Sequence, residues 1–104
     1  MNATLNNSPR PVVSPALCRM MKRCTIARVM AGNAYDRAAA AARTMEGEEG
    51  ADDARATALI ASDAAIMARD AELNVEFAAL QGDNRAARTF VRHAIIAERM
   101  ARGA

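Results

Sequence analysis

The clearest chemical signal in the sequence is a set of five arginines near its C-terminal end. They are spaced three or four residues apart, with one gap that Ile95 fills: Arg85, Arg88, Arg92, Arg99 and Arg102. On an α-helix these residues share one face, and we call them the arginine ridge. Guanidinium groups bind phosphates and carboxylates, so the ridge could bind nucleic acid, an acidic protein or an anionic membrane surface. The alternative is a solvated helix face without a ligand.

Two features count against nucleic acid as the ligand of the ridge. No aromatic residue is interleaved with the arginines to stack on bases. A helix-turn-helix motif that starts from Ala78 and Gly82 would place Arg88 where that motif needs an apolar residue. Nucleic acid is therefore the second hypothesis, behind a protein partner.

Asp63 and Asp70 have the spacing that acid–base or metal chemistry would need, because seven residues bring them to one face of a helix. His93, the only histidine, could approach them from the next helix. However, carboxylates between two packing faces usually pair with arginines of adjacent helices. We therefore predict ion pairs for Asp63 and Asp70, a half-buried packing role for His93, and no catalytic residue, metal or cofactor.

The two cysteines, Cys18 and Cys24, lie six residues apart and so about 240° apart around a helix, which prevents a bridge within it. Thiols that form no disulfide framework are typical of a reducing compartment, and we expect a cytoplasmic location. The first 35 residues contain five basic residues and no acid, which also fits an organelle import sequence. No stretch approaches the roughly 18 apolar residues of a membrane span.

The composition predicts an all-α fold. Of the 104 residues 52% are hydrophobic, but 27 residues are alanine and only three are aromatic. Alanine is the best helix former and a poor core filler, so the helices should approach one another closely and enclose no deep pocket. No segment alternates with period two for long enough to form a strand.

The chain divides into a tail and one helical domain. Residues 1–13 are rich in Asn and Pro and are predicted to be a disordered tail, followed by a single domain over 14–104. Within it we predict a small bundle of three helices, at about 15–45, 53–81 and 84–102. The last two are joined by a short turn and form an αα-hairpin.

Local signals mark where these helices begin and end. Ser14 followed by Pro15 should start the first helix, and Gly32-Asn33 could kink it or break it, which would give four helices. Asp52 or Asp53 should cap the second helix and Asp83 the third. Gly82 should close the second helix in the left-handed conformation.

The second helix carries two apolar faces. One holds large side chains, and the other holds mostly alanine with Ile60, Met67 and Val75. Because an apolar face needs a neighbour, we predict that this helix is central, with the other two helices, or a second subunit, on its two sides. The large residues of the first face are Leu59, Ile66, Leu73, Phe77 and Leu80.

Charge follows the same three segments. The net charge is +6 over residues 1–43, −8 over 44–83 and +4 over 84–104, which together give the +2 of the whole chain. An acidic middle helix between two basic ones predicts ion pairs within the fold, although each exposed pair contributes only ~0–1 kcal/mol.

These observations predict a small, soluble, non-catalytic helical interaction protein, such as a subunit, adaptor or inhibitor. Only 13 large apolar side chains lie between Leu59 and Met100, so a protein partner or self-association would add stability that the thin core lacks. The alternative is an accessory protein that binds nucleic acid through the arginine ridge.

Overall fold

A computed structural model describes residues 14–103, and over this range the chain forms three helices and no strand. The helices are α2 (Pro15–Thr44), α3 (Ala51–Leu80) and α4 (Asn84–Gly103). The predicted all-α fold is confirmed. The predicted disordered tail, residues 1–13, lies outside the described residues.

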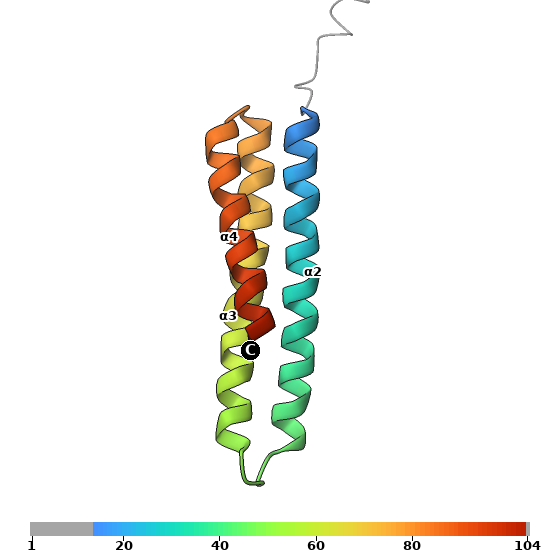
Figure 1. The fold of residues 1–104 in the computed structure, drawn as a ribbon, viewed down its shortest axis with the longest axis vertical. Coiled ribbons are helices and arrows are strands. Elements are labelled where there is room, and N and C mark those ends of the chain that lie inside the picture. The colour runs from blue at the N-terminus through green and yellow to red at the C-terminus, as the bar shows by residue number, and fades with distance from the viewer. Residues whose placement is uncertain (1–13, 104) are drawn as a thin grey trace, which may run out of the picture.

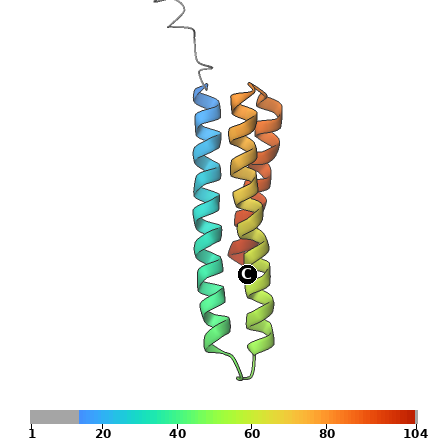
Figure 2. The same cartoon turned by 180° about the vertical axis from the view of Figure 1, so that it is seen from behind.

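The helices pack side by side as an elongated bundle (Figure 1). The chain runs along α2, returns along α3 and turns again into α4, so α3 is antiparallel to both of its neighbours, and each helix contacts the other two. With 30 residues each, α2 and α3 are about 45 Å long, whereas the 20 residues of α4 span about 30 Å. The ends of α2 and α3 that are joined by their loop therefore extend beyond α4 (Figures 1 and 2).

Two helix starts and one helix end follow the predicted signals. The Ser14 hydroxyl accepts a hydrogen bond from the Leu17 N–H at 3.2 Å, and Pro15 occupies the first helical position. The Asp83 carboxylate accepts one from the Ala86 N–H at 3.0 Å at the start of α4. Gly82, after the end of α3, has φ +71°, the left-handed conformation that glycine adopts without steric cost.

The start of α3 differs from the prediction. Its N-cap is Gly50, with φ +89° and no side-chain cap, so neither Asp52 nor Asp53 caps the helix. The left-handed glycine reverses the chain early enough for the helix to begin at Ala51. Both aspartates then lie in the first turn, where their negative charge interacts favourably with the positive end of the helix dipole.

Gly32 and Asn33 do not interrupt α2, which is continuous from Pro15 to Thr44. The four-helix alternative is therefore wrong for the described residues. The flanking segments of α2 both pack on α3, and this tertiary packing outweighs the low helix propensity of one glycine.

Replacing Gly32 with alanine should raise the free energy of unfolding by about 0.5–1 kcal/mol, because alanine loses less backbone freedom in a helix. A Cβ atom at this position would meet nothing within 4 Å. Urea unfolding followed by circular dichroism measures the change. The matched control is Gly82→Ala, which should lower the free energy of unfolding by about 1 kcal/mol because φ at this position is positive. A destabilised Gly32→Ala variant would contradict the expectation.

The core of the bundle is made largely of alanine. Within residues 14–103 the largest fully buried side chains are Val75 and Cys24. Alanine removes little apolar surface per residue, but it lets helix backbones approach closely and gain dispersion contacts along their whole length. The alanines with no exposed surface are Ala27, Ala31, Ala61, Ala64, Ala68, Ala87, Ala94 and Ala97.

The predicted position of α3 between two neighbours on opposite faces is wrong within this chain. Both α2 and α4 pack against the alanine face of α3, which includes Ala64, Ala68 and Val75. The small side chains of this face leave room for two neighbours at once. The opposite face, with the large residues, is left exposed: Leu59, Ile66, Leu73, Phe77 and Leu80.

Candidate functional site

The exposed face of α3 is the most unusual surface of the described chain, and we call its five residues the α3 apolar row. Their exposed fractions are 68% for Leu59, 50% for Ile66, 56% for Leu73, 61% for Phe77 and 67% for Leu80. Four of them follow one another at intervals of seven residues, so the row runs along one side of α3 from Leu59 to its end at Leu80. A face with this pattern normally packs against another helix.

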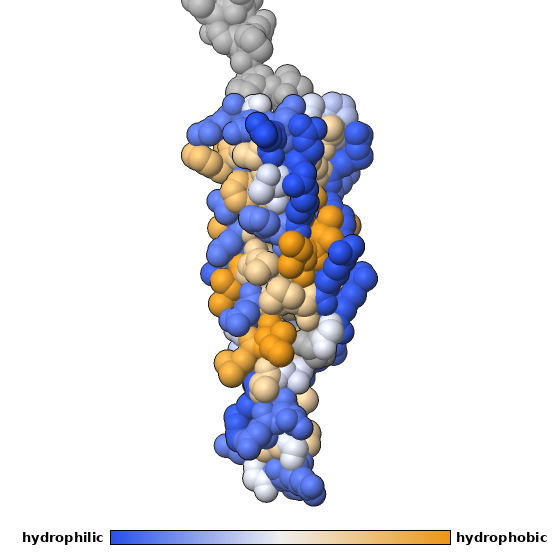
Figure 3. Space-filling model, turned by 60° about the vertical axis from the view of Figure 1, so that its left-hand side comes forward, coloured by the Kyte–Doolittle hydropathy of each residue, from blue (hydrophilic) through white to orange (hydrophobic). Residues whose placement is uncertain are grey.

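Polar residues border the α3 apolar row on both sides. Towards α4, Asp63 and Asp70 line a shallow groove of about 300 Å³ that also includes Ile66. Towards α2, Ser62 and Leu59 line a second groove of about 340 Å³. In Figure 3 apolar patches in orange lie between blue polar side chains on the side of the bundle that is turned to the front.

The arginine ridge is exposed along the whole of α4, as all five of its arginines lie at the surface. On the inward face of α4, Ala87, Ala94, Ala97 and Ala101 are buried and Phe90 is half-buried. Arg102 pairs with Glu98 at 3.2 Å. The other four ridge arginines make no ion pair with any residue in the range 14–103.

A buried ion-pair cluster lies between α2 and α4. Glu98 is only 3% exposed, and its carboxylate accepts two hydrogen bonds from the Arg23 guanidinium, both at 2.9 Å. These hydrogen bonds hold the pKa of Glu98 below its usual range, with further help from the charges of Arg23, Arg102 and Arg99. They also raise the pKa of Arg23. Sequence analysis missed this cluster, although Glu98, the one acid among five arginines, was a signal for it.

Charge pairing between helices is sparser than predicted. Arg28 of α2 pairs with Glu72 of α3 at 2.7 Å, and Thr25 donates a hydrogen bond to the same carboxylate at 2.7 Å. No ion pair within residues 14–103 joins α3 to α4. The reason is geometric, because α4 packs on alanines of α3 while its arginines point away from them. The basic charge of the ridge is therefore not balanced by α3.

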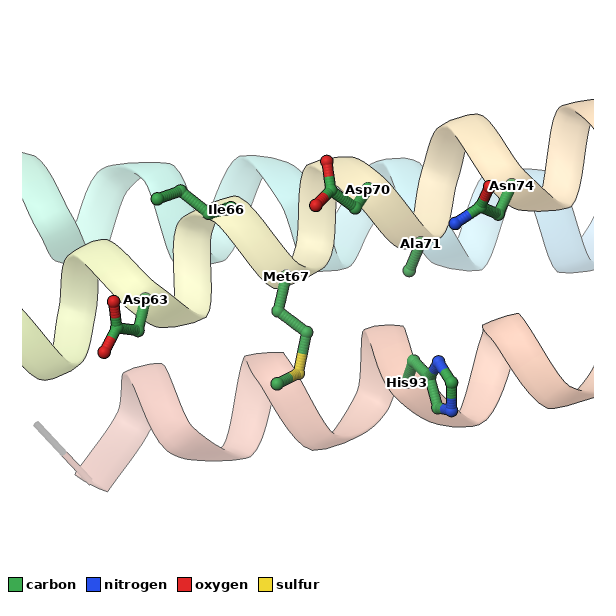
Figure 4. A pocket seen from close by; sticks show the side chains of 7 residues that line it. All are labelled: Asp63, Ile66, Met67, Asp70, Ala71, Asn74 and His93. Carbon is green, nitrogen blue, oxygen red and sulfur yellow. The ribbon is translucent and has the colours of Figure 1, made fainter.

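The predicted roles of Asp63, Asp70 and His93 are also wrong. All three are exposed, and neither aspartate makes an ion pair with another described residue. The His93 ring lies edge-to-face on Phe90 with the ring centres 5.7 Å apart. Figure 4 shows that the two carboxylates do not converge on His93 and that Met67 extends between the helices.

Other candidate chemistry finds little support in the described part of the chain. No group of three His, Cys, Asp or Glu side chains within residues 14–103 could hold a metal ion. Cys24 is completely buried, and burial raises the pKa of its thiol to about 11, which makes the reactive thiolate scarce at neutral pH. Cys18 is exposed.

Two further findings bear on the kind of protein this is. None of the helices in the range 14–103 is long and apolar enough to cross a membrane. Comparison with known proteins finds no matching family model, no matching curated protein and no matching solved structure.

Proposed function

We propose that this chain is a non-catalytic helical interaction protein that binds a protein partner through the α3 apolar row. The observation that carries the proposal is the burial pattern of α3, whose alanine face, with Ala64 and Ala68, is buried while all five residues of the α3 apolar row are half or more exposed. Contiguous apolar surface of this kind on a monomer marks a contact site.

The energy available at the row is sufficient for a specific complex. Full burial of a Leu, Ile or Phe side chain contributes about 1.5–3 kcal/mol. Five side chains that are each half or more exposed would therefore contribute roughly 4–8 kcal/mol on contact, before the cost of association is subtracted. Because the core consists largely of alanine, which buries little apolar surface per residue, burial of the row would add stability that the core does not supply.

A matched pair of isoleucines tests the proposal. Ile66 in the row and Ile26 on α2 are 50% and 51% exposed, so replacing either with aspartate adds the same charge at the same exposure. Ile66→Asp should abolish complex formation and Ile26→Asp should not. The complex is measured by light scattering of the purified protein and by binding to proteins from the native host. Equal binding by both variants would contradict the proposed interface.

A second function, binding of nucleic acid by the arginine ridge, is supported by a separate observation. Four ridge arginines are exposed and make no ion pair within residues 14–103, so their charge is available to phosphates. Binding of this kind releases counterions and weakens steeply as salt rises.

Reversal of two ridge charges tests this second function. Arg88→Glu with Arg92→Glu should weaken a salt-sensitive gel shift by about 100-fold, because two phosphate contacts become repulsive. The control is Arg37→Glu with Arg43→Glu on α2, which makes the same change in net charge at exposed positions. Equal loss in both variants would point to net charge alone, and no shift of the native protein at low salt would eliminate the function.

A further inference from the structure

We propose that the occupant of the α3 apolar row is a second copy of this chain, packed α3 against α3 and parallel about a two-fold axis that runs along the bundle. This inference rests on the proposed function, since it names the partner of the same surface. It follows from the charges that lie at the two edges of the row.

The two edges of the row differ in charge. Asp63 and Asp70 follow Leu59 and Ile66 by four residues, which puts them on the edge that faces α4, where both line the groove. Ser62 and Arg69 follow the same residues by three, which puts them on the edge that faces α2, where Ser62 lines the other groove. One edge is therefore acidic. The other carries Arg69 at nearly the same height as Asp70, with Glu76 two turns further along the helix, where it follows Leu73 by three residues.

In a parallel pair the two-fold axis brings opposite edges together. Arg69 of one copy then lies beside Asp70 of the other, and the same contact occurs twice. Asp63 lies beside Ser62, so neither aspartate of the edge meets a like charge. Each row residue at seven-residue spacing meets its own copy, which is the arrangement that a heptad repeat of Leu and Ile supports.

In an antiparallel pair, by contrast, each edge of the row lies against the same edge of the other copy. With full overlap of the rows, Leu59 would lie against Leu80 and Ile66 against Leu73, and the midpoint would fall between Arg69 and Asp70. Asp70 would then face Asp70 of the other copy, and Arg69 would face Arg69. Like charges at close range oppose association, so the edge charges select the parallel pair.

The first test is the mass of the protein in solution as a function of concentration, by analytical ultracentrifugation. The native chain should be a dimer, Ile66→Asp should raise the dimer Kd at least 100-fold, and Ile26→Asp should leave it unchanged.

Arg69→Asp should raise the Kd about 10-fold because acid then faces acid, and addition of Asp70→Arg should restore it. In an antiparallel pair Arg69→Asp should not raise the dimer Kd, because residue 69 would face residue 69 of the other copy and the two charges would be alike before and after the change.

The second test reads the orientation directly. Leu59→Cys should form a disulfide between its own copies under mild oxidation, with the 59–59 linkage identified by mass spectrometry and the native chain as control. In an antiparallel pair the two Leu59 positions would lie roughly 30 Å apart, and only a mixture of Leu59→Cys with Leu80→Cys would link. Linkage only in the mixture would overturn the parallel arrangement.

The outcomes separate this inference from the proposed function. A native chain that stays monomeric at the highest concentration measured would overturn the second-copy proposal alone, provided that it still binds another protein in a way that Ile66→Asp abolishes. A native chain that neither self-associates nor binds any protein through the row would overturn both.

Discussion

Replacing Arg23 with alanine is expected to lower the free energy of unfolding by about 3 kcal/mol at neutral pH. Glu98 is 3% exposed and takes both of its short hydrogen bonds from Arg23, so the variant leaves a buried carboxylate with only Arg102 beside it at 3.2 Å. The variant is less stable because the Glu98 carboxylate remains out of water without the hydrogen bonds that compensate for its lost hydration. Urea unfolding of the two proteins in the same buffer measures the difference.

The loss of unfolding free energy in Arg23→Ala should become smaller at acidic pH. Since Arg23 lowers the pKa of Glu98 in the folded chain, the pair contributes stability above the usual glutamate pKa of about 4.3, and this contribution disappears as the pH falls through the lowered value. In Arg23→Ala the hydrogen bonds that lower the pKa of Glu98 are gone, while burial still raises it, so the pKa of Glu98 should rise. The two unfolding free energies should therefore converge below about pH 4.

Two controls distinguish the ion pair from a general effect of lost charge. Arg19→Ala removes an exposed arginine of the same helix that makes no ion pair within residues 14–103, and it should change stability by less than about 0.5 kcal/mol. The double variant Arg23→Met with Glu98→Leu should recover most of the loss, because apolar groups of similar size remove the need for pairing. A loss in Arg23→Ala that is independent of pH would show that the aliphatic part of the side chain matters more than its charge.

The helices could be predicted because their signals are local. Ser14 with Pro15 and Gly82 with Asp83 act through hydrogen bonds and backbone angles within a few residues, so tertiary contacts need not be known. The arginine ridge could be predicted for the same reason, as the inward face of α4 is defined by alanines at helical spacing. Local signals failed at the start of α3, where Gly50 ends the loop before the aspartates can cap, and at Gly32-Asn33, which does not interrupt α2.

The choice of face on α3 could not be predicted from its pattern. Both faces are apolar, and a rule that favours burial of the larger side chains would put Leu73 and Phe77 inside. The chain instead buries Ala64 and Ala68, since small residues let α2 and α4 approach α3 together and contact one another as well. Only the assembled bundle shows which of the two surfaces is left over, and that surface is the candidate interface.

Charge failed as a predictor for a related reason. The net charges of the three segments suggested that α3 would neutralise its neighbours, but pairing depends on which side chains meet. α4 presents alanines to α3 and its arginines to solvent, while its single acid, Glu98, turns inward to Arg23 of α2. The pairing of a buried acid with a half-exposed arginine 75 positions away is a tertiary property that segment totals cannot contain.

Close packing of alanine also gives the second large effect that we expect. Ala97→Leu should lower the free energy of unfolding by about 3 kcal/mol, because Ala97 has no exposed surface and lies in one cluster with Ala31, Ala64 and Ala68. The added atoms can be accommodated only if the helices separate, which would loosen their other contacts along the bundle. Thermal and urea unfolding followed by circular dichroism would show the loss.

The control for this substitution is Ala40→Leu, which adds the same atoms at an exposed position of α2 and should change stability by less than about 0.5 kcal/mol. If Ala97→Leu proved as stable as the native chain, the bundle would have room for larger side chains, and small size would not explain why the alanine face is buried. The large residues of α3 could then turn inward at little cost. Loss of stability in Ala97→Leu alone would instead show that small size explains the burial of the alanine face, and that the large residues of the α3 apolar row could not take its place against α2 and α4.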